Sequence, residues 1–178
     1  MKVIGLTLFI LSVLALLALN ASAEAVVSLS SDASAQHNTT VTVPIYIKNI
    51  TNIGSGTISV NYNPDVVHVT KVESGTENAL IVQAWSADNE IGTVKVVAWN
   101  VIAPVSGEVI FANLTFKAVG MGGSSSPLNL TVRDLTDYET YEMIPYTLSN
   151  GSIRVSYNQS ITDIIRKVWS IIKMRWLV

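Results

Sequence analysis

The 178-residue sequence contains no cysteine and only two histidines. Without cysteine the chain cannot form a disulfide, bind a metal through thiolates or use a cysteine nucleophile. Two histidines also leave little room for a histidine-rich metal centre. Charged residues make up 13% of the chain against 49% hydrophobic residues, which excludes a disordered polyelectrolyte. We therefore expect a compact folded protein that lacks the side chains for most enzyme chemistries.

The few charges are distributed unevenly along the chain. Residues 24–155 carry six basic and twelve acidic side chains, whereas residues 156–178 carry four basic and one acidic side chain. The whole chain has a net charge of −2, so it lacks the basic surface that would indicate a nucleic-acid partner. An acidic body between two short basic ends predicts three segments with separate roles.

The first segment, residues 1–23, has the composition of a signal peptide. Lys2 precedes an almost unbroken apolar run, and Ala21-Ser22-Ala23 forms an A-x-A cleavage site before Glu24. These features predict an exported protein located outside the cell or at its surface. An uncleaved N-terminal anchor is the alternative, because the apolar run approaches the length that spans a bilayer.

Sequons for N-glycosylation occur throughout the remaining chain and agree with export. Combined with the absence of cysteine, their number fits an archaeal cell-surface protein better than an animal secreted protein. Bacterial export without glycosylation stays open. The six predicted glycosylation sites are Asn38, Asn49, Asn113, Asn129, Asn150 and Asn158.

The body of the chain, residues 24–156, shows a hydrophobic period of two, which is typical of β-strands. Glycine, proline and asparagine turns separate the strands, and no helical period interrupts them. Nine strands of this kind predict one all-β domain, a sandwich or barrel, and exclude an α/β fold. The predicted strands are 25–30, 40–48, 57–62, 66–72, 79–85, 93–100, 108–118, 128–132 and 152–155.

Five motifs in order along this body resemble the cohesin domain family over about residues 25–155. They are Thr40-Val-Thr-Val-Pro44, Tyr62-Asn-Pro-Asp-Val-Val67, Gly92-Thr-Val-Lys-Val, Phe111-Ala-Asn-Leu-Thr-Phe-Lys117 and Ser149-Asn-Gly-Ser-Ile-Arg-Val155. The resemblance implies a nine-stranded jelly-roll β-sandwich, an architecture shared with carbohydrate-binding modules. It also implies binding of dockerins, which are small helical modules folded by calcium.

The resemblance further places the partner-binding residues on the strand just before the Tyr62 motif. The family presents Asn and Asp there, whereas the matching positions in this chain are Ser55 and Thr57, followed on the same face by Ser59 and Asn61. Hydroxyls can bond helix ends but lack the charge-assisted strength of a carboxylate. We therefore expect a standard dockerin to bind this chain weakly or not at all.

Two tryptophans near the predicted strand 93–100 suggest how this surface is completed. If the small aliphatic residues of that strand point inward, Lys95 and Trp99 lie outward, and Trp85 ends the preceding strand nearby. An exposed aromatic pair suits either a protein interface or a platform for sugars. The alternative is that one tryptophan covers the core of the sandwich.

No set of residues indicates catalysis, a metal or a cofactor. His37 and His68 lack a second ligand at a metal-binding spacing, and Ser106 lacks the G-x-S-x-G context of a nucleophile elbow. A solvated acidic loop is the interpretation favoured for the remaining cluster, because its spacing differs from that of a calcium loop. That cluster consists of Asp134, Asp137, Glu139 and Glu142.

The last segment, residues 157–178, predicts a basic amphipathic helix. Its apolar face contains Ile161, Ile164, Ile165, Val168, Trp169, Ile172 and Trp176. A basic polar face with two tryptophans fits a helix that lies on a membrane surface. Docking on the sandwich or on a partner, and a tail without a role, are the alternatives.

The sequence as a whole predicts a non-catalytic exported adaptor. Its cohesin-like domain would bind a dockerin-type module at the cell surface, with a link to polysaccharide degradation. A module that binds polysaccharide directly, and a structural glycoprotein of the cell envelope, are the two alternatives.

Overall fold

A computed structural model describes residues 24–100 and 102–157, together with five residues of the C-terminal segment, 165, 166, 168, 169 and 172. The predicted signal peptide, the sequon at Asn158 and most of the predicted C-terminal helix lie outside the described residues. The five described residues of that segment have helical backbone. Within the described part of the chain, no helix is long and apolar enough to cross a membrane.

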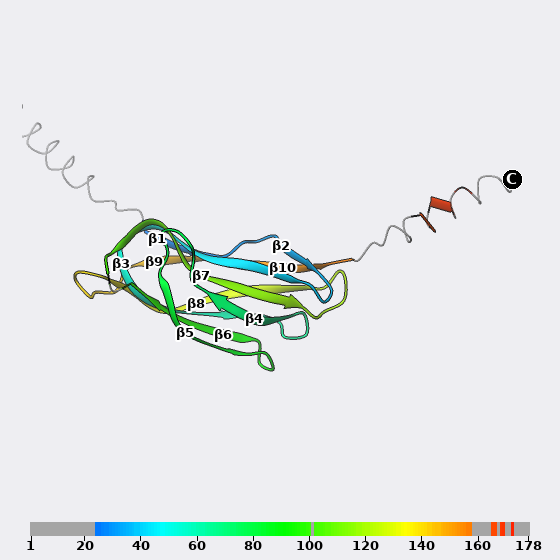
Figure 1. The fold of residues 1–178 in the computed structure, drawn as a ribbon, viewed down its shortest axis with the longest axis horizontal. Coiled ribbons are helices and arrows are strands. Elements are labelled where there is room, and N and C mark those ends of the chain that lie inside the picture. Colours follow the sequence, from blue (N-terminus) through cyan, green and yellow to red (C-terminus); the bar gives the residue numbers. More distant parts are fainter. Residues whose placement is uncertain (1–23, 101, 158–164, 167, 170–171, 173–178) are drawn as a thin grey trace, which may run out of the picture.

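The described body consists of ten β-strands that run along its length (Figure 1). They are β1 (Ala25–Ser28), β2 (Ala33–Gln36), β3 (Thr40–Asn61), β4 (Val67–Glu73), β5 (Ile81–Asp88), β6 (Thr93–Trp99), β7 (Val105–Ala118), β8 (Ser125–Asp137), β9 (Tyr146–Ser149) and β10 (Gly151–Ser156).

The long strand β3 belongs to both sheets of a β-sandwich. Its first half pairs with β1 and β7, which gives one sheet in the order β9-β1-β3-β7-β4. Its second half pairs with β8 and β6, which gives the other sheet in the order β2-β10-β8-β3-β6-β5. The two layers are therefore joined through the backbone of a single strand.

Two asparagines allow β3 to cross between the sheets. Asn49 and Asn52 have positive φ angles of 56° and 53°, and the register with β7 shifts on both sides of Ile50. Asparagine tolerates this left-handed conformation better than most residues do. Ile50 and Ile53 remain buried through the crossing, so the strand changes sheet without leaving the core.

The core lies between the sheets and is made almost entirely of aliphatic side chains and two phenylalanines, Phe111 and Phe116. Alternate residues of β3 supply it from both halves, for example Val43 and Ile45 in the first sheet and Ile58 and Val60 in the second. Because side chains alternate along a strand, burying these residues forces their neighbours to the outside.

The structure confirms the predicted all-β sandwich and differs in how the strands are divided. The predicted strands 40–48 and 57–62 are one continuous strand, because the segment between them stays in the core. Two further strands, β2 and β9, were not predicted. Both have only four residues and pair on one side with a single neighbour, so they lack the hydrophobic alternation that marks a buried strand.

Asn89, in the turn between β5 and β6, ties the two sheets together at one end. Its Oδ1 accepts hydrogen bonds from the Tyr62 hydroxyl at 2.6 Å and from the Val69 amide at 2.9 Å, and its Nδ2 donates to the Val69 carbonyl at 3.0 Å. The Tyr62 ring packs edge-on against Phe116, with centroids 5.6 Å apart. Burial is the main cause that raises the pKa of Tyr62.

We expect Asn89→Ala to lower the free energy of unfolding by about 1–3 kcal/mol, because it leaves the Val69 amide without its Asn89 partner and the Tyr62 hydroxyl with only the Asp88 carbonyl at 3.4 Å. Tyr62→Phe removes only one of the three bonds and is expected to cost about 0.5–1.5 kcal/mol. Urea unfolding of both variants measures the difference. An Asn89→Ala variant as stable as the unchanged protein would contradict this role.

Candidate protein-binding face

The outer surface of β8, β3, β6 and β5 forms a grid of rows, because residues paired across neighbouring strands point to the same side of a sheet. We call it the four-strand face. From β8 through β3 and β6 to β5, its four rows are Asn129-Asn61-Thr93-Asp88, Thr131-Ser59-Lys95-Ser86, Asp134-Thr57-Val97-Ala84 and Thr136-Ser55-Trp99-Ile81.

The composition of the four-strand face changes from one end to the other. The first two rows contain only polar or charged side chains, whereas the last row ends in Trp99 and Ile81, which are 38% and 44% exposed. Thr57, near the centre, is 8% exposed, so little more than its edge reaches solvent. The face therefore combines hydrogen-bonding groups with an apolar end.

The structure brings together six of the seven residues predicted for partner binding. Ser55 pairs with Trp99 and Ser59 pairs with Lys95, while Thr57 and Asn61 occupy the rows between and beside them. Of the alternatives for Trp99, the exposed position is the one observed. The seventh residue, Trp85, does not join them.

Trp85 of β5 points to the opposite side of the sheet from Trp99 of β6. It pairs with Val96, which is fully buried, and a register shift between Val82 and Ala84 moves it out of line with the outward residues. Its side chain instead borders a hollow with Glu73 and Ser74 at the end of β4. Two-residue alternation would put Trp85 on the same side as Ile81, and the bulge at Gln83 reverses it.

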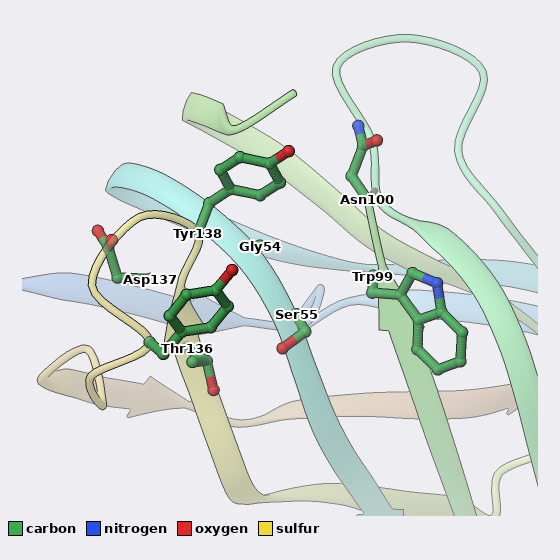
Figure 2. Close-up of a pocket in the computed structure, with 8 residues that line it drawn as sticks. Gly54, Ser55, Trp99, Asn100, Thr136, Asp137 and Tyr138 are labelled. Carbon is green, nitrogen blue, oxygen red and sulfur yellow. The ribbon is translucent and has the colours of Figure 1, made fainter. Parts of the chain in front are cut away.

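An aromatic hollow of about 440 Å³ opens at the apolar end of the four-strand face. Trp99 forms one side of it, Tyr138 lies across from Trp99, and Ser55 lies between them (Figure 2). The other lining residues are Gly54, Asn100, Thr136, Asp137 and Tyr141. Aromatic rings with a few polar groups around them are typical of binding hollows in proteins.

The backbone of β3 holds both walls of the aromatic hollow. The Tyr138 amide donates to the Asn52 carbonyl at 2.7 Å, and the Asn100 amide donates to the Gly54 carbonyl at 2.8 Å. A Cβ atom at Gly54 would lie 2.9 Å from the Cα of Tyr138, which is closer than real side chains approach. Glycine at this position therefore allows the Tyr138 wall to pack directly on β3.

Asp137 orders the turn that carries the aromatic residues. Its Oδ1 accepts hydrogen bonds from the amides of Glu139 and Thr140, both at 2.8 Å. These two bonds, from Thr140 first and Glu139 second, lower the pKa of the Asp137 carboxyl. The turn ends at Tyr141, which has a φ of 59° and is 82% exposed.

The charged residues of the four-strand face form no ion pair with one another in the described structure. The ion pairs found there are Lys48 with Glu108 and Lys71 with Glu73, and neither pair is part of the face. Lys95 is therefore available to an acidic group of a partner, and Asp134 to basic or N–H groups. The Asp88 carboxylate already accepts hydrogen bonds from the Glu90 and Ile91 amides in the turn after β5.

The histidines and the serine considered for metal binding or catalysis take part in hydrogen bonds or strand pairing that hold the fold. His37 donates from Nδ1 to the Gly120 carbonyl at 2.8 Å, and His68 lies in β4 paired with Lys117. Ser106 accepts a hydrogen bond from the Asn52 amide, which supports the crossing of β3. Among the described residues, no group of three or more His, Asp or Glu side chains could hold a metal ion.

Sequence reasoning did not single out Tyr138 or Tyr141. The segment from Asp137 to Tyr141 drew attention only for its acidic residues, although two tyrosines around a polar turn were a signal for an exposed aromatic surface. Their approach to Trp99 depends on β8 pairing with β3, which no local pattern specifies.

Comparison with known proteins shows which family this fold belongs to. The family model of the cohesin domain matches residues 26–155. Among solved structures, the sixth cohesin of scaffoldin B from Acetivibrio cellulolyticus, in complex with a mutant dockerin, is 16% identical with a TM-score of 0.64, covering 75% of this chain and 99% of that one. No curated protein matches the chain in sequence.

Two further cohesins have a similar structure. The non-cellulosomal cohesin of the archaeon Archaeoglobus fulgidus is 18% identical with a TM-score of 0.63, covering 77% of this chain and 94% of that one. The cohesin of a cohesin–dockerin complex from Clostridium thermocellum is 13% identical with a TM-score of 0.63, covering 74% and 99%. At these identities the likeness establishes the fold.

The two hydrogen bonds to the Asp137 carboxylate predict how the turn responds to acid. Because hydrogen bonds lower its pKa, Asp137 stabilises the turn at all pH values above its ordinary pKa, and this stabilisation is lost as the pH falls through the lowered pKa. We expect the amide proton shifts of Glu139 and Thr140 in an NMR titration to change with a midpoint below the value of about 3.9 for a free aspartate.

Asp137→Asn is the matched control for this titration, because it keeps an acceptor oxygen without an ionisable group. Its Thr140 amide shift should lack the change that the unchanged protein shows below the pKa of a free aspartate, and any change left at the Glu139 amide then belongs to the Glu139 carboxyl itself. A midpoint at or above that of a free aspartate in the unchanged protein would contradict the two bonds.

Proposed function

This chain belongs to the cohesin domain family, and we propose that it is a non-catalytic adaptor that binds a partner protein through the four-strand face. The partner proposed is a dockerin-type module, as in the cohesins of similar structure that were solved as complexes with dockerins. The observation that carries the proposal is the placement of Ser55, Thr57, Ser59, Asn61, Lys95 and Trp99 on the same outer side of one sheet.

The polar rows supply the directional part of binding. Hydroxyl groups such as Ser59 and the Asn61 amide can both donate and accept hydrogen bonds, which suits the ends and polar side chains of a helix. Lys95 adds one positive charge beside Ser59. With hydroxyls where the family presents Asn and Asp, a partner needs its own charged groups to form the stronger bonds.

The aromatic hollow supplies the apolar part. Tryptophan and tyrosine are enriched among the residues that contribute most to protein interfaces, and they do so where a partner excludes water from them. Trp99 borders both the four-strand face and the hollow, so a partner on the face would cover it. We propose that a side chain of the partner enters the hollow between Trp99 and Tyr138.

The aromatic hollow also favours one second candidate, a module that binds polysaccharide directly. Aromatic rings stack on the apolar faces of sugars, and Asn100 and Ser55 add polar groups beside Trp99. The protein partner is preferred because Trp99 continues into a polar surface, whereas the hollow by itself leaves the first two rows without a role.

We further propose that residues 1–23 direct export and that the C-terminal segment holds the protein at a membrane surface. Of the described residues in that segment, Ile165, Val168, Trp169 and Ile172 are between 44% and 61% exposed. An exposed apolar stripe with basic residues such as Arg166 is typical of helices that bind a lipid surface.

The first experiment is a pull-down from an extract of the cells that make the protein, with immobilised residues 24–156. This portion contains the whole described core and omits the C-terminal segment, so adhesion to lipid cannot imitate binding. Binding in calcium, elution with EDTA and mass spectrometry should identify a partner with a dockerin-like module. An empty eluate would reject the proposed partner class.

With the partner in hand, Trp99→Ala should weaken binding by about tenfold or more, since the loss of an interface tryptophan costs about 2 kcal/mol. Trp85→Ala is the matched control, because Trp85 is similarly exposed but lies off the four-strand face. Its affinity should stay within about twofold of the unchanged domain, as measured by calorimetry. Equal losses for both variants would place the interface elsewhere.

A fluorescence titration separates the second candidate from the first. Soluble oligosaccharides of cellulose, xylan, mannan and chitin should leave the tryptophan emission of residues 24–156 unchanged if the partner is a protein. Quenching that saturates in the unchanged domain and disappears in Trp99→Phe would instead establish a sugar site in the aromatic hollow.

A further inference from the structure

One of the predicted glycosylation sites lies on the four-strand face. Asn129 of β8 pairs directly with Asn61 of β3, and the hydroxyl residue of its sequon, Thr131, pairs with Ser59. Paired residues in an antiparallel sheet have Cα atoms about 4.5–5.5 Å apart. The sequon therefore occupies the same two rows that carry the polar residues proposed for partner binding.

The side chain of Asn129 is also available for modification. It is exposed, and among the described residues it makes no side-chain hydrogen bond. Asn113 differs, because its Nδ2 donates to the Ser74 carbonyl at 3.3 Å, and a glycan there would leave only one N–H for that bond. A glycan on Asn129 would leave the fold intact and change only what the face can contact.

The other sequons in the described residues lie off the face. Asn38 is in the turn between β2 and β3, Asn49 is at the crossing of β3, and Asn113 is on β7 in the other sheet. Asn150 precedes Gly151, which pairs with Leu128, and it accepts a hydrogen bond from the Leu130 amide, so it lies beside Asn129 just outside the grid. Asn129 is thus the sequon with a direct position in the grid.

The size of an interface makes the position of Asn129 decisive. Strands about 4.8 Å apart and rows about 6.8 Å apart give the grid dimensions of about 14 by 20 Å. A specific partner covers about 800 Å² of each protein, which is larger than this grid. A footprint of that size centred on the face includes Asn129, although the residue is at a corner.

We propose that N-glycosylation of Asn129 closes the four-strand face, so that the glycan and the partner exclude each other. The modification joins the anomeric carbon of a lipid-linked oligosaccharide to Nδ2, breaks the bond from that carbon to the phosphate oxygen, and releases the lipid phosphate and one amide proton. The inference rests on the proposed function, because it assigns control to the same face.

The first test compares two pools of the full-length chain purified from its own cells. The chain is divided by affinity for the calcium-dependent partner, and glycopeptides are mapped in the bound and unbound fractions. We expect glycan on Asn129 in the unbound fraction and unmodified Asn129 in the bound fraction, with Asn38, Asn49 and Asn113 equally occupied in both. The proposal is overturned if Asn129 carries no glycan in either fraction, or carries it equally in both.

The second test uses the absence of cysteine, which allows a single attachment point to be introduced. Full-length Asn129→Cys is labelled with a maleimide polymer of about the size of an N-glycan, and Thr42→Cys, exposed on the opposite sheet, is labelled as the matched control. Labelling at position 129 should weaken partner binding about tenfold or more, and labelling at position 42 less than about twofold.

The unlabelled Asn129→Cys variant separates the two ways of failing. If the unlabelled variant and the labelled form both bind the partner as the unchanged chain does, the proposal that a glycan on Asn129 blocks binding is wrong and the proposed function stands. If neither the unlabelled variant nor the unchanged chain binds a partner, the proposed function is wrong, and so is the proposal about the glycan.

Discussion

The crossing of β3 from one sheet to the other is the constraint on which the rest of the structure depends. A single backbone pairs with β1 and β7 in one layer and with β8 and β6 in the other, so the two sheets cannot be positioned independently. Left-handed conformations at Asn49 and Asn52 permit the crossing, while Ile50 and Ile53 keep it in the core. The same segment fixes the aromatic hollow, because Asn52 and Gly54 hold its two walls.

The core and the four-strand face are two consequences of one alternation. Burying Ile58 and Val60 leaves Thr57, Ser59 and Asn61 outside, so a slip of one residue would expose the core and bury the polar rows together. The hydrophobic energy that sets the register therefore also positions the binding groups. A bulge interrupts the alternation, and the one in β5 places Trp85 on the opposite side of the sheet from the four-strand face.

The face offers a partner both kinds of interaction that a specific interface uses. Polar rows provide hydrogen bonds and a charge at Lys95, and Trp99 with the aromatic hollow provides apolar surface that gains from being covered. Asn129 adds a position at which an attached glycan would block binding to the whole face. Membership of the cohesin family and this geometry agree on a role in binding, and neither requires catalytic chemistry.

The sequence by itself determined the sandwich class, the family and the outward positions on β3, because alternation and family motifs are local and both are written along one strand. It left open whether Trp99 is exposed or covers the core, and the structure shows it exposed. Only the tertiary structure decided that Trp85 lies on the other side, that Tyr138 and Tyr141 approach Trp99, and that Asn129 stands beside Asn61. These are relations between strands distant in sequence, and they follow from pairing register and bulges, which the packing of the whole core sets and no local pattern encodes.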